Sequence, residues 1–376
     1  MAIDNKEKEV LNVPPLRFPE FTGEWQCKAI EKVAPLQRGF DLPTQNLVEG
    51  IYPVIYSNGI LQHHDKYKCE APGLITGRSG TIGKFTYIDS GFYWPHNTSL
   101  WVTDFCGNCP KFIYYLYQTV HIEQFSTGSG VPTLNRNDVH RYKTSVPTAI
   151  VEQEKIAKFL SILDERIVTQ NKIIEDLNKL KSAIIEMEYT HKTKGNTHIG
   201  DFIEQTSKRN KDSAIQNVLS VSNSQGFIQQ CEQFENRSVA SDDISNYKIV
   251  ERNCFAFNPA RINVGSIARL TTFNRGIVSP MYICFRTKDN LFPEYLDYYF
   301  ESKQFFTEIQ KRLEGSVRQC LSYEGLCNIP LCIPTVEVQQ QTGKRLSTLV
   351  QEIKLEIDFL ELLQKQKKFL LHQMFI

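Results

Sequence analysis

The stretch PTAIVEQ at residues 147–153 returns as PTVEVQQ at residues 334–340, and each copy opens a long segment without proline. The offset is 334 − 147 = 187, and without a gap it also pairs Leu134 with Leu321 and Lys181 with Lys368. This period is far longer than a solenoid repeat of about 20–50 residues and has the size of a small domain plus a helix. The sequence therefore predicts two similar halves with pseudo-twofold symmetry. A duplicated binder of this kind fits a twofold target, most commonly duplex DNA with two half-sites.

The composition is that of an ordinary globular protein with little net charge. The 376 residues favour two or three domains, and 41% hydrophobic with 23% charged residues excludes wholesale disorder. Lys and Arg number 43 and Asp and Glu 42, which gives a formal net charge of +1. Because simple DNA-binding domains are usually basic, DNA binding would require positive charge gathered on one face, or a partner that supplies most phosphate contacts.

Targeting and metal signals are weak. The charged start does not resemble a signal peptide, and no run of about 18 apolar residues predicts a membrane span, so we expect a cytoplasmic protein with reduced thiols. Cys106 and Cys109 form one close pair, but a structural zinc site needs about four ligands. His63 and His64 would point to opposite sides of a strand. Incidental thiols and no bound metal are the favoured interpretation.

Short apolar runs broken by turn residues predict irregular strands with few helices in each half. In the first half we expect strands at 51–56, 73–75 and 82–88, a turn at 57–59, and an aromatic helix at 112–117 after Pro110. The second half follows the same course, with strands at 218–221, 254–257 and 266–270 and an aromatic helix at 295–300 after Pro293.

Two long helices follow the mixed domains. Apolar residues recur at alternating steps of four and three in both, which predicts coiled-coil seams. The first seam contains Ile156, Leu160, Leu163 and Ile167 and continues, after a break in register, through Ile173, Leu177, Leu180, Ile184 and Met187. The second contains Leu346, Val350, Ile353, Ile357, Leu360, Leu371 and Met374. We expect the helices to lie side by side and antiparallel.

These features together resemble the specificity subunit of type I restriction-modification systems. The resemblance is carried by LRFPEF at 16–21 with Trp25, by the paired helix starts at Pro147 and Pro334, and by IAKFLSILD at 156–164. It covers nearly the whole chain. The second helix departs from the pattern at Thr342-Gly343, where a glycine weakens the first turns by up to about 1 kcal/mol.

The resemblance implies an α+β fold: two similar mixed α/β target-recognition domains joined by two long antiparallel coiled-coil helices. It also implies that each domain binds one half of a bipartite double-stranded DNA site. The helices would fix the spacer and dock two adenine-N6 methyltransferase subunits, which motor-nuclease restriction subunits would join. S-adenosylmethionine, ATP and Mg²⁺ would be bound by those partners and no cofactor by this chain. The expected order is an N-terminal arm (1–24), a first recognition domain (25–146), a first helix (147–189), a linker (190–197), a second recognition domain (198–333) and a second helix (334–376).

Candidate DNA contacts are polar side chains in loops that recur in both halves, since such side chains reach bases and phosphates. The first loop pair offers Arg78, Ser79, Thr81 and Lys84 in one half and Arg261, Asn263 and Arg269 in the other. A second pair offers Ser129 against Arg318 and Gln319, and a third offers Ser57 and Asn58 against Ser222 and Asn223. Ordinary turns with solvated side chains are the alternative interpretation.

No catalytic motif is present in the sequence. A DNA methyltransferase should show an Asn/Asp-Pro-Pro-aromatic motif, and a motor should show a phosphate-binding loop; neither occurs. The protein is therefore expected to be non-catalytic. The competing hypothesis is a protein-interaction scaffold with duplicated heads on a coiled coil, which uniform mixed surface charge would favour over DNA binding.

Overall fold

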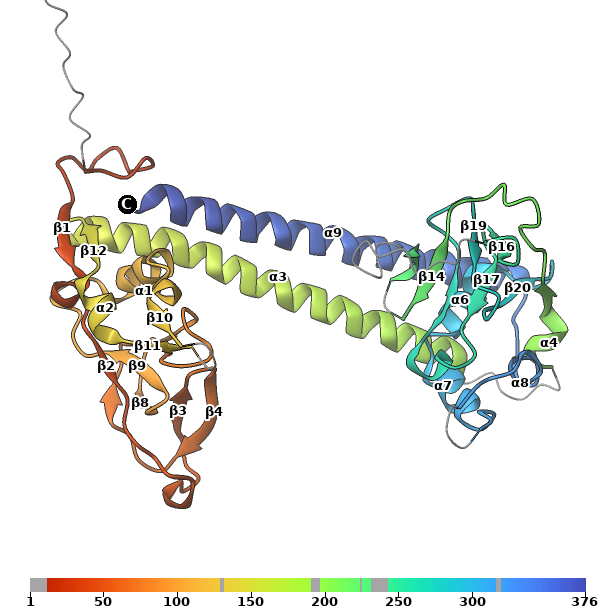
Figure 1. The fold of residues 1–376 in the computed structure, drawn as a ribbon, viewed down its shortest axis with the longest axis horizontal. Helices are drawn as coiled ribbons and strands as arrows, with labels where there is room; N and C mark the ends of the chain where they lie inside the picture. The colour runs from red at the N-terminus through yellow and green to blue at the C-terminus, as the bar shows by residue number, and fades with distance from the viewer. Residues whose placement is uncertain (1–11, 129–131, 191–196, 224, 231–242, 316–318) are drawn as a thin grey trace, which may run out of the picture. The chain divides into compact units, whose positions relative to one another are not determined.

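The sequence repeat reappears as a repeated order of strands. The structure is a computed structural model that describes residues 12–128, 132–190, 197–223, 225–230, 243–315 and 319–376 (Figure 1). The chain forms two compact units. Unit 1 comprises the chain up to residue 171 together with 358–376, and unit 2 comprises residues 172–357.

Unit 1 contains two four-stranded sheets. The first is antiparallel, in the order β2 (Leu36–Arg38), β9 (Ser99–Val102), β6 (Gly73–Gly77), β7 (Phe85–Ile88). The second has the order β4 (Gly59–His64), β3 (Tyr52–Tyr56), β8 (Phe92–Pro95), β5 (Cys69–Glu70), and its β3–β8 pair is parallel. Two small antiparallel pairs complete the set: β1 (Gln26–Ala29) with β12 (Lys143–Val146), and β10 (Ser126–Thr127) with β11 (Thr133–Leu134).

Unit 2 repeats both sheets with equivalent strands. Its four-stranded sheet has the order β13 (Ile203–Thr206), β20 (Ile283–Thr287), β17 (Phe255–Phe257), β18 (Ile267–Arg269). The hairpin β14 (Leu219–Ser222)–β15 (Gly226–Gln229) and the pair β16 (Lys248–Glu251)–β19 (Arg275–Val278) are joined by a parallel bridge between Val218 and Ile277. The resulting order β15-β14-β19-β16 reproduces β4-β3-β8-β5, so the predicted duplication is present in the topology.

Helices cover the sheets at equivalent places. In unit 1 these are α1 (Pro110–Thr119) and α2 (Arg136–Arg141), with short 3-10 turns η1 (Ile30–Lys32), η2 (Thr44–Asn46) and η3 (Ile122–Phe125). In unit 2 they are α4 (Ile199–Phe202), α6 (Pro293–Tyr299), α7 (Lys303–Gln310) and α8 (Tyr323–Cys327), with η4 at Ile262–Val264. A proline opens both α1 and α6, where its missing N–H costs nothing.

The long helices are α3 (Ile150–Thr190) and α9 (Val336–Met374), and the boundary between the units falls inside both. In each unit a segment of α9 lies antiparallel beside a segment of α3 (Figure 1). Lys367 Nζ lies 2.6 Å from Asp164 Oδ1 in unit 1, and Arg345 Nη1 lies 3.8 Å from Glu188 Oε1 in unit 2.

Both seams run in regular steps of four and three, so the break in register predicted for the first helix does not occur in α3. The seam positions, all buried or half-buried, are Ile156, Leu160, Leu163, Ile167, Gln170, Ile174, Leu177, Lys181 and Ile184 in α3, and Thr342, Leu346, Leu349, Ile353, Glu356, Leu360, Leu363, Lys367 and Leu370 in α9. The two sets correspond at an offset of 342 − 156 = 186, not 187.

Part of the predicted seam therefore needs correction. Ile173, Leu180 and Met187 in α3, and Val350 and Ile357 in α9, are exposed. Leu371 lies beside the seam, packed against the unit 1 core. The physical reason is that polar side chains occupy several seam positions, so a search for apolar residues moves to exposed apolar neighbours.

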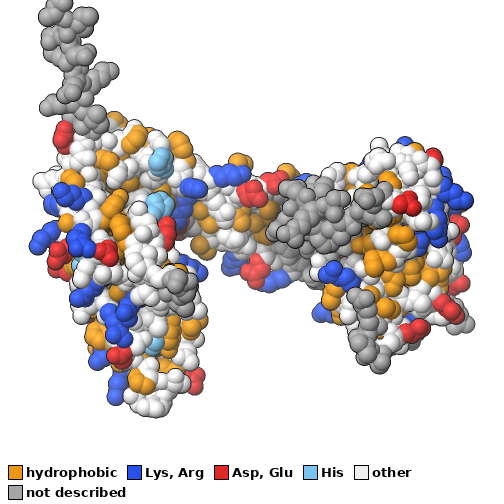
Figure 2. All heavy atoms as spheres, viewed as in Figure 1, with side chains coloured by type: hydrophobic (Ala, Val, Ile, Leu, Met, Phe, Trp, Pro, Cys, Tyr) orange, Lys and Arg blue, Asp and Glu red, His pale blue; other side chains and the backbone are white. Residues whose placement is uncertain are grey.

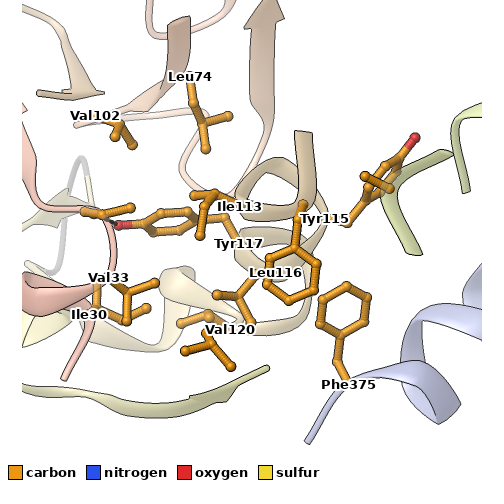
Figure 3. Close-up of a cluster of buried hydrophobic side chains, with 14 of the residues drawn as sticks. Ile30, Val33, Leu74, Val102, Ile113, Tyr115, Leu116, Tyr117, Val120 and Phe375 are labelled. Carbon is orange, nitrogen blue, oxygen red and sulfur yellow. Dashed lines mark hydrogen bonds between the residues drawn. The ribbon is translucent and has the colours of Figure 1, made fainter. Parts of the chain in front are cut away.

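The end of α9 completes the core of unit 1. Phe375 is 5% exposed and stacks on Phe112 with ring centroids 5.3 Å apart, and Trp25 meets it edge-on at 6.4 Å. Figure 3 shows Phe375 reaching the cluster around Leu116 and Val120. Tyr189, which lies 375 − 189 = 186 residues earlier, does the same in unit 2 against Tyr295 and Tyr299.

Candidate nucleic-acid interface

In unit 1 the first and third candidate loops meet at Gly77. A Cβ on Gly77 would lie 2.2 Å from the Thr81 carbonyl oxygen and 3.0 Å from that of Ser57, so only glycine fits. Thr98 holds both loops: its carbonyl oxygen accepts the Arg78 N–H at 2.9 Å and its hydroxyl accepts the Ser57 N–H at 3.3 Å. The β6–β7 loop and the β3–β4 turn therefore form one surface.

Unit 2 brings the equivalent loops together in the same way. Gly265 in the β17–β18 loop has φ +88, and a Cβ there would lie 3.7 Å from Asn223 in the β14–β15 turn. Ser266 Oγ donates to the Val221 carbonyl oxygen at 3.2 Å. Arg261 is exposed and lines a hollow of about 340 Å³, whereas Asn263 is half-buried in η4.

Arginines line a hollow on the first recognition domain. This hollow of about 630 Å³ is lined by Arg38, Arg78 and Arg136, with polar atoms of Gln37 and Asn135 beside them. Arg38 is partly neutralised by Asp41, 3.1 Å away, but both side chains are well exposed. Three guanidinium groups around one concavity give a local positive field that the net charge of +1 conceals.

The sequence prediction included Arg78 but missed Arg38 and Arg136. Arg38 ends β2 and Arg136 begins α2, so folding brings both to the β6–β7 loop across about 40–60 residues of sequence. One signal was available: Asn135 is a helix N-cap, and its side chain accepts the Asn137 N–H at 3.0 Å. Arg136 directly follows this N-cap, so its backbone is fixed at the start of α2, as expected for a residue that positions a charge.

Arg269 does not join the other candidates. Its guanidinium is 3.0 Å from Asp297 and 3.4 Å from Glu294, both on α6, and it donates to Asn253 at 3.0 Å. Only 11% of the side chain is exposed. We remove Arg269 from the candidate set, because its charge is engaged in fixing β18 to α6.

The other predicted residues are dispersed. Ser79 forms an antiparallel bridge with Thr133, and Thr81 is half-buried. Lys84, Asn58, Asn223 and Gln319 are exposed, and Ser222 is half-buried in its turn. Ser129 and Arg318 lie outside the described residues. Gln319 directly precedes Cys320, which forms an antiparallel bridge with Glu314. This bridge is equivalent to the Thr127–Thr133 pair of unit 1.

The described residues offer no metal centre: nowhere among them do three His, Cys, Asp or Glu side chains gather in a way that could hold an ion. Cys106 is exposed and Cys109 is the N-cap of α1. Within the same residues, no helix has the length and apolar character needed to cross a membrane.

Comparison with known proteins finds a family match over part of the chain and a similar fold over nearly all of it. Residues 22–179 match the model described as the Type I restriction modification DNA specificity domain. No curated protein sequence matches the chain. The fold resembles the S subunit of a type I restriction-modification system from M. genitalium, at 17% identity and a TM-score of 0.63, over 97% of this chain and 99% of that one.

A second solved structure, described as showing complex assembly and conformational transition of the type I R-M system, is 13% identical with a TM-score of 0.53, over 92% of this chain and 96% of that one. At these identities the two structures show a shared fold, which includes both units. Residues 22–179 are thus similar to the type I restriction-modification DNA specificity domain, and the fold of the whole chain is similar to that of an S subunit.

Proposed function

We propose that this protein is the sequence-recognition subunit of a type I restriction-modification complex and that each unit reads one half-site of a bipartite DNA target. One observation carries the proposal: both units place the same two loops together, Ser57 with Gly77 and Asn223 with Gly265. Equivalent loops on equivalent sheets provide two binding surfaces of one design, and their different side chains would read different bases.

The charge distribution supports DNA over a protein-only scaffold. A scaffold predicts mixed charge around both heads, whereas the hollow of unit 1 is lined by Arg38, Arg78 and Arg136 with Asp41 as the one acidic side chain. Arginine is the side chain best suited to bidentate contact with phosphate or guanine. The arrangement therefore fits duplex DNA, whose backbone is polyanionic and whose grooves expose guanine edges.

The long helices would fix the distance between the half-sites. Their regular seams hold α3 and α9 in one register, because a slip by one residue would bury charged side chains of the neighbouring rows. Apolar side chains also remain exposed on both helices, including Ile162 and Val168 on α3 and Leu362 and Phe369 on α9. We propose that these exposed side chains dock two methyltransferase subunits, which motor-nuclease subunits then join.

In this proposal the chemistry belongs to the partners. S-adenosylmethionine would be bound by the methyltransferase subunits, and ATP and Mg²⁺ by the partner subunits, all acting in the cytoplasm. This chain would contribute binding and spacing, so its variants should change which sites are modified before they change how fast a site is modified.

Methylome sequencing tests the proposal. A host expressing this chain with its methyltransferase partner should gain adenine methylation at one bipartite motif. Replacing residues 25–146 with the same region of a relative should change one half of that motif and leave the other half and the spacer intact. Loss of modularity, with both halves changing, would contradict the assignment of one half-site to each unit.

A further inference from the structure

A second basic surface in unit 2 lies outside the paired loops. It is built on Lys208-Arg209-Asn210-Lys211, between β13 and β14, where three cations occupy four residues. All three cationic side chains are exposed, whereas Asn210 is fully buried. The buried Asn210 side chain therefore anchors the loop, while the three cationic side chains lie in solvent.

The anchor is specific. Asn210 Nδ2 donates to the Ile215 carbonyl oxygen at 2.9 Å, and its Oδ1 accepts the Ile215 N–H at 3.1 Å, which closes the loop on itself. The Asn210 N–H donates to the Tyr247 carbonyl oxygen at 3.0 Å, and the Ile249 N–H to that of Lys208 at 2.8 Å. The loop is therefore held against β16 in a preorganised shape.

The loop lines a hollow of about 690 Å³, and Arg275 of β19 is part of the same lining. Asp212 is the one acidic residue in its lining, and Asp212 Oδ1 already accepts the Ala214 N–H at 3.3 Å. Arg252 follows β16 beside this edge, with its N–H on the Asn274 carbonyl oxygen. Figure 2 shows Lys and Arg side chains gathered over the β16–β19 part of unit 2.

The corresponding segment of unit 1 carries no such charge. Residues 40–50, between β2 and β3, contain Asp41 and Glu49 and no Lys or Arg. The basic loop is thus not part of the shared scaffold. It is also continuous with the paired loops of its own unit, since Tyr247, which bonds to Asn210, lines the hollow beside Arg261.

We propose that Lys208, Arg209, Lys211 and Arg275 bind the sugar-phosphate backbone of DNA beside the half-site read by unit 2. The inference rests on the proposed function and adds a second contact surface to it. Arg209 Nη1 donates to Asn246 Oδ1 at 2.8 Å, and all four cationic side chains are exposed. Exposed cations that flank a wide hollow suit phosphates, whose spacing is independent of sequence, better than base edges. The basic loop would then add electrostatic affinity to the binding of the half-site by unit 2. Residues 40–50, the equivalent segment of unit 1, would add none.

The test is a salt series on the complex with its methyltransferase partner. The variant carries K208Q, R209Q and K211Q together, which leaves Asn210 in place. The plot of log affinity against log salt has a negative slope, and each lost phosphate contact reduces its magnitude by about 0.9, so the magnitude should fall by roughly 2–3. Affinity at about 0.15 M salt should fall about 10- to 100-fold, equally for the cognate duplex and for one with both half-sites scrambled.

The matched control removes three exposed lysines elsewhere in unit 2 by K288Q, K303Q and K311Q. It should leave the slope within about one unit of the wild-type value. A basic-loop variant whose slope equals that of the control overturns the proposal. A loss confined to the cognate duplex also overturns it, because that pattern indicates base reading. A change in the methylated motif does so as well.

The experiments distinguish failure of the proposed function from failure of the proposed backbone contact. If the wild-type complex methylates no bipartite motif, the proposed function is wrong, yet the slope for the scrambled duplex still decides whether this loop contacts a DNA backbone. Circular dichroism and the unfolding midpoint of the triple variant should match the wild type, since the replaced side chains are exposed.

Discussion

Gln153 and Gln339 occupy the same structural position, although the sequence repeat aligns Gln153 with Gln340. Gln153 Oε1 accepts the Cys109 N–H at 2.9 Å, at the start of α1, and its Nε2 donates to the Pro147 carbonyl oxygen at 2.9 Å. Gln339 Oε1 accepts the Phe292 N–H at 2.7 Å, at the start of α6, and its Nε2 donates to the Pro334 carbonyl oxygen at 2.9 Å. Each long helix is thus tied to its recognition domain by one buried carboxamide.

This equivalence predicts unequal effects of two neighbouring substitutions. Gln339→Ala should lower the free energy of unfolding by about 1–3 kcal/mol, because it leaves buried backbone groups without partners. Gln340→Ala, at an exposed position, should change it by less than about 0.5 kcal/mol. Urea denaturation of both variants measures the difference. Equal losses of unfolding free energy would contradict the equivalence of Gln339 with Gln153.

Phe375 should contribute to unit 1 although it is the penultimate residue. Phe375→Ala removes the ring that stacks on Phe112 and should cost about 3–5 kcal/mol, as for other buried aromatic side chains. Ile376→Ala is the control, since Ile376 is 50% exposed. Urea denaturation followed by circular dichroism measures the unfolding midpoint of each variant. Similar midpoints for both variants would show that the end of α9 is not part of the core.

The fold class was predictable because duplication leaves traces that need no tertiary information. The repeat at Pro147 and Pro334, and the prolines that open α1 and α6, located both helices and both mixed domains. The strand predicted at 82–88 was too long, since β7 begins at Phe85. Its first residues belong to the loop that folds back over Gly77.

The one-residue shift of the repeat could not be read from the sequence. The missing residue lies between Pro334 and the first turn of α9, where PTVEVQQ still resembles PTAIVEQ letter by letter. The seam was misplaced for a related reason: Gln170, Lys181, Glu356 and Lys367 occupy inward positions that an apolar pattern assigns elsewhere. The arginine hollow was missed because Arg38 and Arg136 are adjacent only after folding.

Spacer length should respond to both helices together. Inserting one heptad between Gln170 and Asn171 in α3, and another between Phe359 and Leu360 in α9, preserves both seams and lengthens each helix by roughly 10 Å. The recognised spacer should grow by about three base pairs at about 3.4 Å each. Methylome sequencing gives the new motif. An insertion in α3 alone is the control; it should abolish methylation, because the seams fall out of register.

Mild acid should loosen the arginine hollow of unit 1. His140 on α2 accepts the Leu36 N–H of β2 at 2.9 Å through Nε2, which requires the neutral ring. Burial lowers the pKa of His140 from its usual value near 6.5. A lowered histidine pKa means that its stabilising contribution is complete above about pH 6.5 and is lost as pH falls through the folded value. The free energy of unfolding should therefore fall more steeply below about pH 6.5 in the wild type than in His140→Gln, whose amide oxygen can still accept the bond.

The paired loops should separate phosphate contact from base reading. Arg78→Ala and Arg261→Ala should each weaken DNA binding by the assembled complex, because both guanidinium groups lie at hollows beside the glycine-built loops. A base-reading arginine costs about 1–3 kcal/mol and relaxes specificity at one position, whereas a phosphate-bound one lowers affinity evenly and reduces the salt slope by about one. We expect the phosphate pattern, since small residues in the loop let its backbone come close to a DNA strand.

Lys28→Ala, an exposed cation on β1, serves as the control. Binding of cognate and scrambled duplexes over a salt series distinguishes the patterns. Affinities equal to the control for both arginine variants, at every salt concentration, would remove these loops from the interface and leave them as plain turns.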